Sequence, residues 1–316
     1  MSFTPLMIKL IPSLIDDLPA IPTVCELGNQ TFDPTISGQL AKPEDLIIPR
    51  VMAFLDKRGK PWDRAELQRL AAMTPEEQKP HTASYFRALG FASYDAIDVN
   101  SLYGSMIMDL NVDLREKYAF TQTYDLVTNN GTGEHIFNQY AVVKNMHQLT
   151  KVGGMLLFVL PFYNWMNHGF FNFNPLLFTD LAAANGYDVV RLAVGCPVGQ
   201  EAAARESRVN DREMRLPWQP ETAPLTIADF QRRGAIVPRT PRNVASATVK
   251  TLLGRGEEVR QMSPLPGVVE KLAERVPNIN VIAALRKTRD AEFQVPLQGM
   301  YAGQNVESAD LRACYG

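Results

Sequence analysis

The sequence predicts an α/β fold with an open, doubly wound and mostly parallel β-sheet. Two observations support this class. Short apolar runs recur along the chain, and each one ends in a polar or glycine-containing segment, as buried parallel strands do. Helical periodicity fills an interval between two of these runs. The chain has 316 residues, of which 46% are hydrophobic and 21% charged, so a globular protein with a substantial core is expected.

Seven apolar runs are predicted to be strands of this sheet. In chain order they are Thr23–Leu27, Tyr94–Ile97, Ser105–Met108, Tyr124–Thr128, Met155–Leu160, Tyr187–Val194 and Asn280–Arg286. Open parallel sheets bind ligands outside the carboxyl ends of their strands. The residues that end the first five runs are therefore candidate site residues.

Two segments between these runs are predicted to be helices. Glu134–Lys151 has apolar residues at helical spacing and reaches a glycine stop at Gly153–Gly154, so it is expected to be a crossover helix. Pro175–Asn185 is expected to begin after an N-cap at Asn174 and to end at Gly186.

Two long insertions, 31–80 and 196–278, interrupt the alternation in what we interpret as a single domain spanning 1–316. The helical pieces expected in them are Glu44–Leu55 with a bend at Pro49, Arg64–Met73, Ile227–Arg233 and Val268–Arg275. Long insertions in compact domains are often lids or binding loops. For both insertions, two interpretations remain open: surface decoration and a cap over the strand ends. For 31–80 the cap would cover a cofactor cleft.

Charge and cysteine content exclude several classes of protein. Lys and Arg number 32 against 34 Asp and Glu, so there is no basic excess for binding nucleic acid. The three cysteines are outside any CxxC spacing, which favours a reducing, cytoplasmic location over a disulfide framework or a thiolate zinc site. The longest apolar run, Met155–Phe162, is far shorter than the roughly 20 residues that span a bilayer, and no membrane segment is expected.

Acids and amides end the first four runs in a particular order. Val24–Gly28 is followed by Asp98, by Asp109 and by the block Tyr124–His135, after which come the crossover helix and Lys151–Gly154. This order resembles class I S-adenosylmethionine-dependent methyltransferases, over roughly residues 20–195 and the last strand. The resemblance implies a Rossmann-like methyltransferase sheet of seven strands with the last one antiparallel. It also implies transfer of a methyl group from S-adenosylmethionine to a small oxygen-bearing acceptor, for example a sugar or another hydroxylated metabolite.

The resemblance also implies a cofactor site at the strand ends. Its residues are Glu26, Gly28, Asn29, Asp98, Val99, Asp109, Leu110, Asn129 and Asn130. Glu26 is expected to face the ammonium group, and Asp98 to accept hydrogen bonds from the ribose hydroxyls. Asp109 is expected near the adenine amino group.

The remaining cofactor residues come from the loops after the first and fourth runs. Gly28 is expected to let the backbone approach the cofactor with no intruding side chain, and Asn129 or Asn130 is expected near the methyl-transfer face. Gly28 is followed by Asn29 and Gln30, without a second glycine. A non-catalytic member that binds a nucleoside or a protein therefore stays open as an alternative. A nucleotide-sugar oxidoreductase is a further alternative, disfavoured because the dinucleotide fingerprint is absent.

The segment 161–175, after the fifth run, combines aromatic, amide and imidazole side chains, which suits a polar small-molecule substrate. Tyr163, Asn167 and Asn172 are the expected substrate contacts. His168 is the expected general base, because imidazole titrates near neutral pH. His135 is expected either to shape the same site or to pack there.

The alternative interpretation of this segment is structural and equally open. In it, Phe170, Phe171 and Phe173 belong to the core and the asparagines form turns. No two of the four histidines are three to five residues apart, so no metal site is expected.

Overall fold

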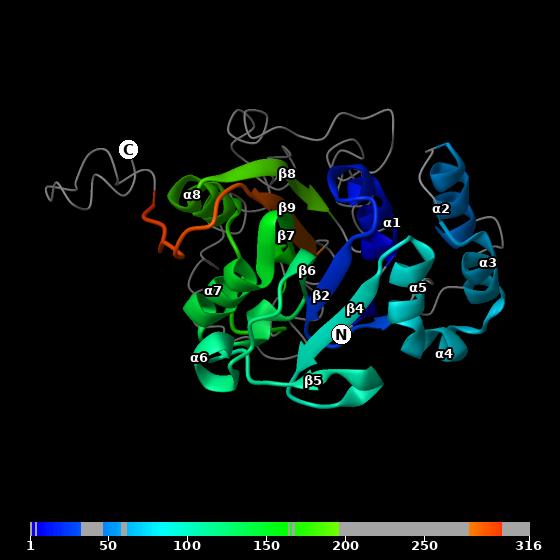
Figure 1. Cartoon of the computed structure of the whole chain (residues 1–316), viewed down its shortest axis with the longest axis horizontal. Helices are drawn as coiled ribbons and strands as arrows, with labels where there is room; N and C mark the ends of the chain where they lie inside the picture. The colour runs from blue at the N-terminus through cyan, green and yellow to red at the C-terminus, as the bar shows by residue number, and fades with distance from the viewer. Residues whose placement is uncertain are drawn as a thin grey trace, which may run out of the picture.

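The computed structural model describes residues 2–3, 5–32, 47–57, 62–163, 165, 168–195 and 278–298. They form a seven-stranded sheet between two helical layers, together with a separate two-stranded pair (Figure 1). The strands are β1 Ser2–Phe3, β2 Thr23–Leu27, β3 Thr31–Phe32, β4 Ser93–Asp98, β5 Met106–Ile107, β6 Tyr124–Asn130, β7 Thr150–Tyr163, β8 Tyr187–Gly195 and β9 Ile279–Lys287. The α-helices are α1 Pro5–Leu14, α2 Ile47–Asp56, α3 Arg64–Ala72, α4 Pro75–Gln78, α5 Thr82–Ala88, α6 Leu114–Tyr118, α7 Gln139–Leu149 and α8 Pro175–Asn185.

The large sheet has the strand order β5-β4-β2-β6-β7-β9-β8. The pairs formed among β5, β4, β2, β6 and β7 are parallel, whereas β9 lies antiparallel between β7 and β8. The predicted fold class, with seven strands and an antiparallel last strand, is therefore confirmed. All seven predicted strands are present, and β2 has the predicted bounds.

Side chains alternate between the two faces of the sheet, so each strand contributes to two cores. Val24 and Leu126 face a core shared with α1, α2, α3 and α5, whereas Cys25 and Val127 face a core that includes residues of α6, α7 and α8. The two helical layers lie on opposite sides of the sheet in Figure 1. Helix α1, which the sequence did not predict, has nearly all its apolar residues fully buried.

The connection between β6 and β7 differs from the prediction. Helix α7 begins at Gln139, because the side chain of Asn138 accepts a hydrogen bond from the backbone N–H of Ala141 (3.2 Å) and caps it there. Glu134, predicted to be helical, lies instead in a short 3₁₀ turn, Gly133–His135. The predicted glycine stop is also wrong, because α7 ends at Leu149 and β7 begins at Thr150. Gly153, with φ +82°, lies inside β7 where its register against β6 shifts.

The prediction for the second crossover is confirmed. Helix α8 spans Pro175–Asn185, and the side chain of Asn174 accepts a hydrogen bond from the N–H of Leu176 (3.0 Å). Gly186 takes φ +64° and ends the helix. The structural signals in this segment are local, so the sequence was sufficient to find them.

The described helices of the first insertion belong to the helical layer on one face of the sheet. Helix α2 packs against α1 and α3, and α3 also packs against α5. Pro49 falls in the first turn of α2, where a proline requires no bend, so the predicted bend is not needed. That the insertion 31–80 caps the cofactor cleft stays a prediction, and its residues 33–46 and 58–61 lie outside the described residues.

Most of the second insertion, residues 196–277, lies outside the described residues, and so do the predicted helical pieces Ile227–Arg233 and Val268–Arg275. Within the described part of the chain, no helix combines the length and the apolar character that crossing a membrane requires.

Candidate functional site

The strand order reverses between β2 and β6, which pair side by side although β4 and β5 lie between them in the chain. The connections after these two strands leave toward opposite edges of the sheet, and the general rule for such sheets places a crevice where they part. Gly28–Gln30 follows β2, and Gly131–His135 follows β6. Open α/β sheets bind their ligands at such a reversal, so this crevice is the candidate site.

The end of β2 is in close contact with the turn after β6. Gly28 has φ +80°, and a Cβ built on it would lie 2.1 Å from Oγ1 of Thr132. The Thr132 hydroxyl donates a hydrogen bond to the carbonyl of Leu27 (2.6 Å). The side chain of Thr132, which sequence reasoning did not single out, therefore occupies the space that was expected to stay open above Gly28.

Buried amides join the two walls of the crevice. Nε2 of Gln30 donates to the carbonyl of Asn130 (3.0 Å), and Nδ2 of Asn130 donates to Oε1 of Gln30 (3.2 Å). Oδ1 of Asn129 accepts a hydrogen bond from the N–H of Gly133 (2.8 Å), which sets the direction of the turn after β6. Asn129 and Asn130 end β6, and their side chains are engaged with the protein itself.

Asp98 lies at the end of β4 and fixes the loop after β2. Its carboxylate accepts hydrogen bonds from the N–H of Asn29 (2.7 Å), the N–H of Val99 (2.6 Å) and Nδ2 of Asn100 (2.8 Å). The side chain of Asn29 in turn donates to the carbonyl of Leu102. Val99 is 73% exposed, so its side chain is open to a ligand or to solvent.

The predicted residues after β5 have different surroundings from one another. Oδ1 of Asp109 accepts hydrogen bonds from the N–H and the side chain of Asn111 (2.8 and 2.9 Å), which makes a local turn. Leu110 is buried and belongs to the core beneath α6, α7 and α8. Only the backbone of Leu110 remains a candidate for contact with a ligand.

Glu26 is fully buried, on the face of the sheet that α1 and α5 cover. Its carboxyl group accepts hydrogen bonds from the hydroxyls of Tyr94 (2.8 Å) and Thr128 (3.3 Å). Burial raises the pKa of Glu26 to about 8, an effect that these two hydrogen bonds partly oppose. At neutral pH the carboxyl group is therefore mostly protonated.

A second polar cluster lies where the loops after β6 and β7 meet. Oε1 of Glu134 is 3.3 Å from Nε2 of His168 and 3.8 Å from Nε2 of His135. Glu134 is fully buried, and apart from its own backbone N–H no hydrogen-bond donor of the described residues is placed to reach its carboxylate oxygens. Burial raises the pKa of Glu134 to about 7 and lowers the pKa of each histidine, so both imidazoles are mainly neutral at pH 7.

Close backbone packing holds this cluster together. The N–H of Phe170 donates to the carbonyl of Glu134 (2.7 Å), and a Cβ on Gly169 would lie 2.8 Å from Cγ of Glu134. The ring of Trp165 lies 4.6 Å from that of His168, measured between centroids. The structure thus brings together the two predicted catalytic histidines and adds Glu134, a residue that the prediction missed.

The loop after β7 combines both interpretations that the sequence left open. Phe173 is buried in the core and Phe171 packs against it, whereas Phe170 is 68% exposed and contacts the ring of Phe137. Tyr163, at the end of β7, and Asn172 are both exposed. Asn167 lies outside the described residues. An aromatic surface therefore borders the cluster of Glu134, His135 and His168.

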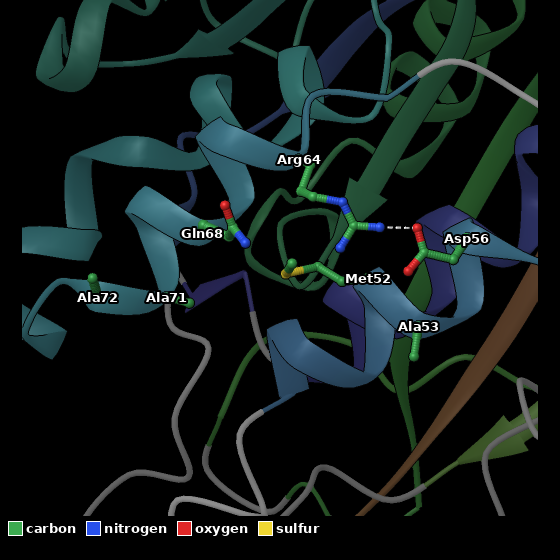
Figure 2. A pocket seen from close by; sticks show the side chains of 7 residues that line it. All are labelled: Met52, Ala53, Asp56, Arg64, Gln68, Ala71 and Ala72. Carbon is green, nitrogen blue, oxygen red and sulfur yellow. Dashed lines mark hydrogen bonds and ion pairs between the residues drawn. The ribbon is translucent and has the colours of Figure 1, made fainter.

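A separate hollow of about 480 Å³ lies between α2 and α3 (Figure 2). Asp56 of α2 and Arg64 at the start of α3 form an exposed ion pair beside it, as Figure 2 shows. None of the predicted site residues lines this hollow, and exposed ion pairs contribute little binding energy. We therefore place the candidate site at the crevice and not here.

Comparisons with known proteins give weak structural similarities. No protein-family model matches the chain, and no curated protein matches it. A SAM-dependent methyltransferase from Geobacter sulfurreducens, in complex with S-adenosyl-L-homocysteine, is 11% identical with a TM-score of 0.38, and the match covers 90% of this chain and 91% of that chain.

Two further solved structures are similar to a comparable degree. A SAM-dependent methyltransferase from Thiobacillus denitrificans is 15% identical, with a TM-score of 0.34 and coverage of 90% of this chain and 92% of that one. An O-methyltransferase from a Brevibacillus brevis multienzyme is 11% identical, with a TM-score of 0.33 and coverage of 81% and 82%. At such low identity and TM-score, we base neither the fold nor the function of this chain on these similarities.

The contact between Gly28 and Thr132 predicts an unequal cost for two glycine substitutions. Gly28 and Gly153 have nearly the same φ, +80° and +82°, but a Cβ on Gly153 would have no neighbour within 4 Å in the described part of the chain. Gly153→Ala should cost only the roughly 1–2 kcal/mol of left-handed strain. Gly28→Ala should cost at least about 1 kcal/mol more, because overpacking is added to the same strain. Urea unfolding of both variants measures the difference, and equal costs would contradict the contact.

The raised pKa of Glu26 predicts that stability falls as pH rises. Between the ordinary carboxyl pKa of 4.5 and about 8, the folded chain keeps a proton that the unfolded chain releases. The free energy of unfolding therefore decreases with pH, by at most about 1.4 kcal/mol per unit from this group. Glu26→Gln should remove this part of the slope and stabilise the chain most at pH 8. The comparison with the parent also cancels the contribution of Glu134, and parallel slopes would show that Glu26 ionises normally.

Proposed function

We propose that the chain transfers a methyl group from S-adenosylmethionine to a small, oxygen-bearing acceptor. One observation carries the proposal. Glu26, Asp98 and Asp109 lie at or just after the carboxyl ends of the neighbouring strands β2, β4 and β5, beside the reversal of strand order. This row of acids suits a ligand that combines an ammonium group with a nucleoside.

The acids fit the cofactor with two adjustments, one at Asp98 and one at Glu26. A carboxylate has about four lone-pair positions, and Asp98 uses three of them for Asn29, Val99 and Asn100. Two hydrogen bonds from ribose hydroxyls therefore require the exposed side chain of Asn100 to give up its own. Glu26 would become charged beside a bound ammonium group, because a nearby cation lowers the pKa of a carboxyl group.

The two histidines serve the acceptor end of the crevice in this proposal. The cofactor supplies a methyl group on a positively charged sulfur, which an acceptor oxygen can attack. The chain aligns the acceptor and removes its proton if it is a neutral hydroxyl. His168 can accept that proton, because burial and the neighbouring His135 keep its pKa below the ordinary value. The exposed rings of Phe137 and Phe170 provide apolar surface for the acceptor.

The alternative of a non-catalytic member is favoured by a specific observation. Thr132 fills the space above Gly28 that the cofactor was expected to approach. Calorimetric titration with S-adenosylmethionine and S-adenosylhomocysteine tests the cofactor directly, and a screen of hydroxylated acceptors then tests transfer. Absence of binding to either compound would remove the proposal, whereas binding without any turnover would favour the alternative.

Substitution of Asp98 should weaken cofactor binding. A hydrogen bond to a charged group contributes about 1.5–3 kcal/mol, so Asp98→Ala should lower the affinity for S-adenosylmethionine at least roughly tenfold. Asn100→Ala is the matched control, since it frees one position on Asp98 and should leave the affinity unchanged or raise it. Calorimetry on folded protein, verified by thermal unfolding, measures both. Unchanged affinity in Asp98→Ala would show that this acid does not hold the ribose.

Substitution of His168 should lower turnover and spare cofactor binding. General-base catalysis is typically worth about a hundredfold to ten-thousandfold, so His168→Ala should reduce kcat at least roughly a hundredfold. The affinity for S-adenosylmethionine should stay within about twofold, because His168 lies on the acceptor side. His81→Ala, which removes a histidine outside the cluster, should leave both quantities unchanged. Near-normal turnover in His168→Ala would contradict its role as base.

A further inference from the structure

We propose that Glu134, His135 and His168 form a binding site for one divalent transition-metal ion of the zinc type. The proposal concerns metal binding by the chain itself and does not depend on methyl transfer. It goes against the sequence prediction, which excluded a metal site because no histidines were close together in the chain.

The geometry of the three side chains suits a single ion. One ligand atom from each residue can be chosen so that all three lie within 4.8 Å of one another. Zinc bonds to imidazole nitrogen and carboxylate oxygen are about 2.0–2.2 Å long, so two ligands of one tetrahedral ion lie roughly 3.3–3.6 Å apart. The 3.3 and 3.8 Å separations of Glu134 from the two histidines are already close to this range. Small rotations of the partly exposed imidazoles can complete the arrangement.

The burial of Glu134 points to a missing positive charge. Its carboxylate is completely buried and aims at the two imidazoles, and apart from its own backbone N–H no donor among the described residues is placed to reach it. A buried carboxylate without a partner is costly, and native proteins rarely keep one. A divalent ion between Glu134 and the imidazoles would satisfy it. Glu26, by contrast, is equally buried but has two hydroxyl donors.

The backbone holds the ligands in place from both sides. Glu134 and His135 follow β6 on a turn fixed by Asn129, and His168 is held over Glu134 by the close approach of Gly169. Such support keeps the ligand donors near one another before the ion arrives, which favours binding.

One side of the cluster is open. The side chains of His135 and His168 are 39% and 37% exposed, whereas Glu134 is not exposed at all. Three protein ligands with an open position are typical of catalytic zinc sites, whereas structural sites have four. One consequence does rest on the proposed function: an ion here would bind the acceptor hydroxyl and lower its pKa, and His168 would then be a ligand in place of its role as base.

Calorimetric titration of the untagged, full-length chain with Zn²⁺, after removal of metals with a chelator, tests the site. We expect one Zn²⁺ per chain. His135→Ala, His168→Ala and Glu134→Gln should each weaken binding at least tenfold. His81→Ala is the matched control and should bind Zn²⁺ as the parent does. Replacement of Zn²⁺ by Co²⁺ should give the visible absorption of a four-coordinate ion in the parent and not in the three ligand variants.

The outcomes separate this proposal from the proposed function. The metal site would be overturned if the parent bound no stoichiometric Zn²⁺, or if His135→Ala and His168→Ala bound Zn²⁺ as tightly as the parent. Either result would leave methyl transfer untouched. If Glu134→Gln fails to fold, the two histidine variants decide alone, because their side chains are partly exposed. Cofactor binding measured on the same samples should not change in any variant. Zn²⁺ binding in a chain that binds no S-adenosylmethionine would overturn the proposed function and support the metal site.

Discussion

The contact between the end of β2 and the turn after β6 determines the shape of the candidate site. The hydroxyl of Thr132 reaches the carbonyl of Leu27, and the missing side chain at Gly28 lets it do so. These two strands are the pair at which the sheet reverses its order, so both walls of the crevice begin at this contact. Glu134 and His135 follow Thr132 almost immediately, and the contact therefore also positions the acidic and imidazole side chains of the second wall.

The two buried carboxyl groups of the site, those of Glu26 and Glu134, have different surroundings. Glu26 and Glu134 are both removed from solvent, and burial raises the pKa of each. The hydroxyls of Tyr94 and Thr128 satisfy Glu26, so this carboxyl group is stable within the folded sheet as it stands. Among the described residues no hydroxyl reaches Glu134, which faces two imidazoles instead. A buried polar group without a partner lowers the stability of the fold. Such a group is therefore expected where a protein binds or transfers a charge, because the ligand then supplies the missing partner.

Several residues at the crevice have structural hydrogen bonds as well as positions suited to a ligand. Asp98 holds the loop after β2, Asn129 holds the turn after β6, and Asn130 pairs with Gln30 between them. These bonds fix the carboxyl ends of the strands before any ligand arrives. A preorganised crevice loses less conformational entropy on binding than a flexible one. Changes at these residues would therefore alter the shape of the crevice together with its contacts.

The sequence by itself determined the elements whose signals are local. The run Thr23–Leu27 is bounded by turn residues and became β2 with the same limits, and Asn174 and Gly186 mark both ends of α8. The antiparallel direction of β9 followed from the family resemblance and not from the run itself. For β2 and α8 the deciding residues lie inside or beside the element. For β9 the deciding signal was the order of the strand-end residues, which carries the resemblance.

Tertiary structure decided the rest, because the deciding neighbours are far apart in the chain. The helical pattern of the segment includes Glu134, but the hydrogen bonds of Asn129 and Asn138 make α7 begin after it. The same pattern includes Thr150, which instead pairs with β6 as the first residue of β7. His135 and His168 follow different strands. They meet only because β6 and β7 pair in parallel, so the loops after both strands lie at the same edge of the sheet. Spacing along the chain cannot reveal such a cluster, since a sheet brings strand ends together regardless of the length of the helix between them.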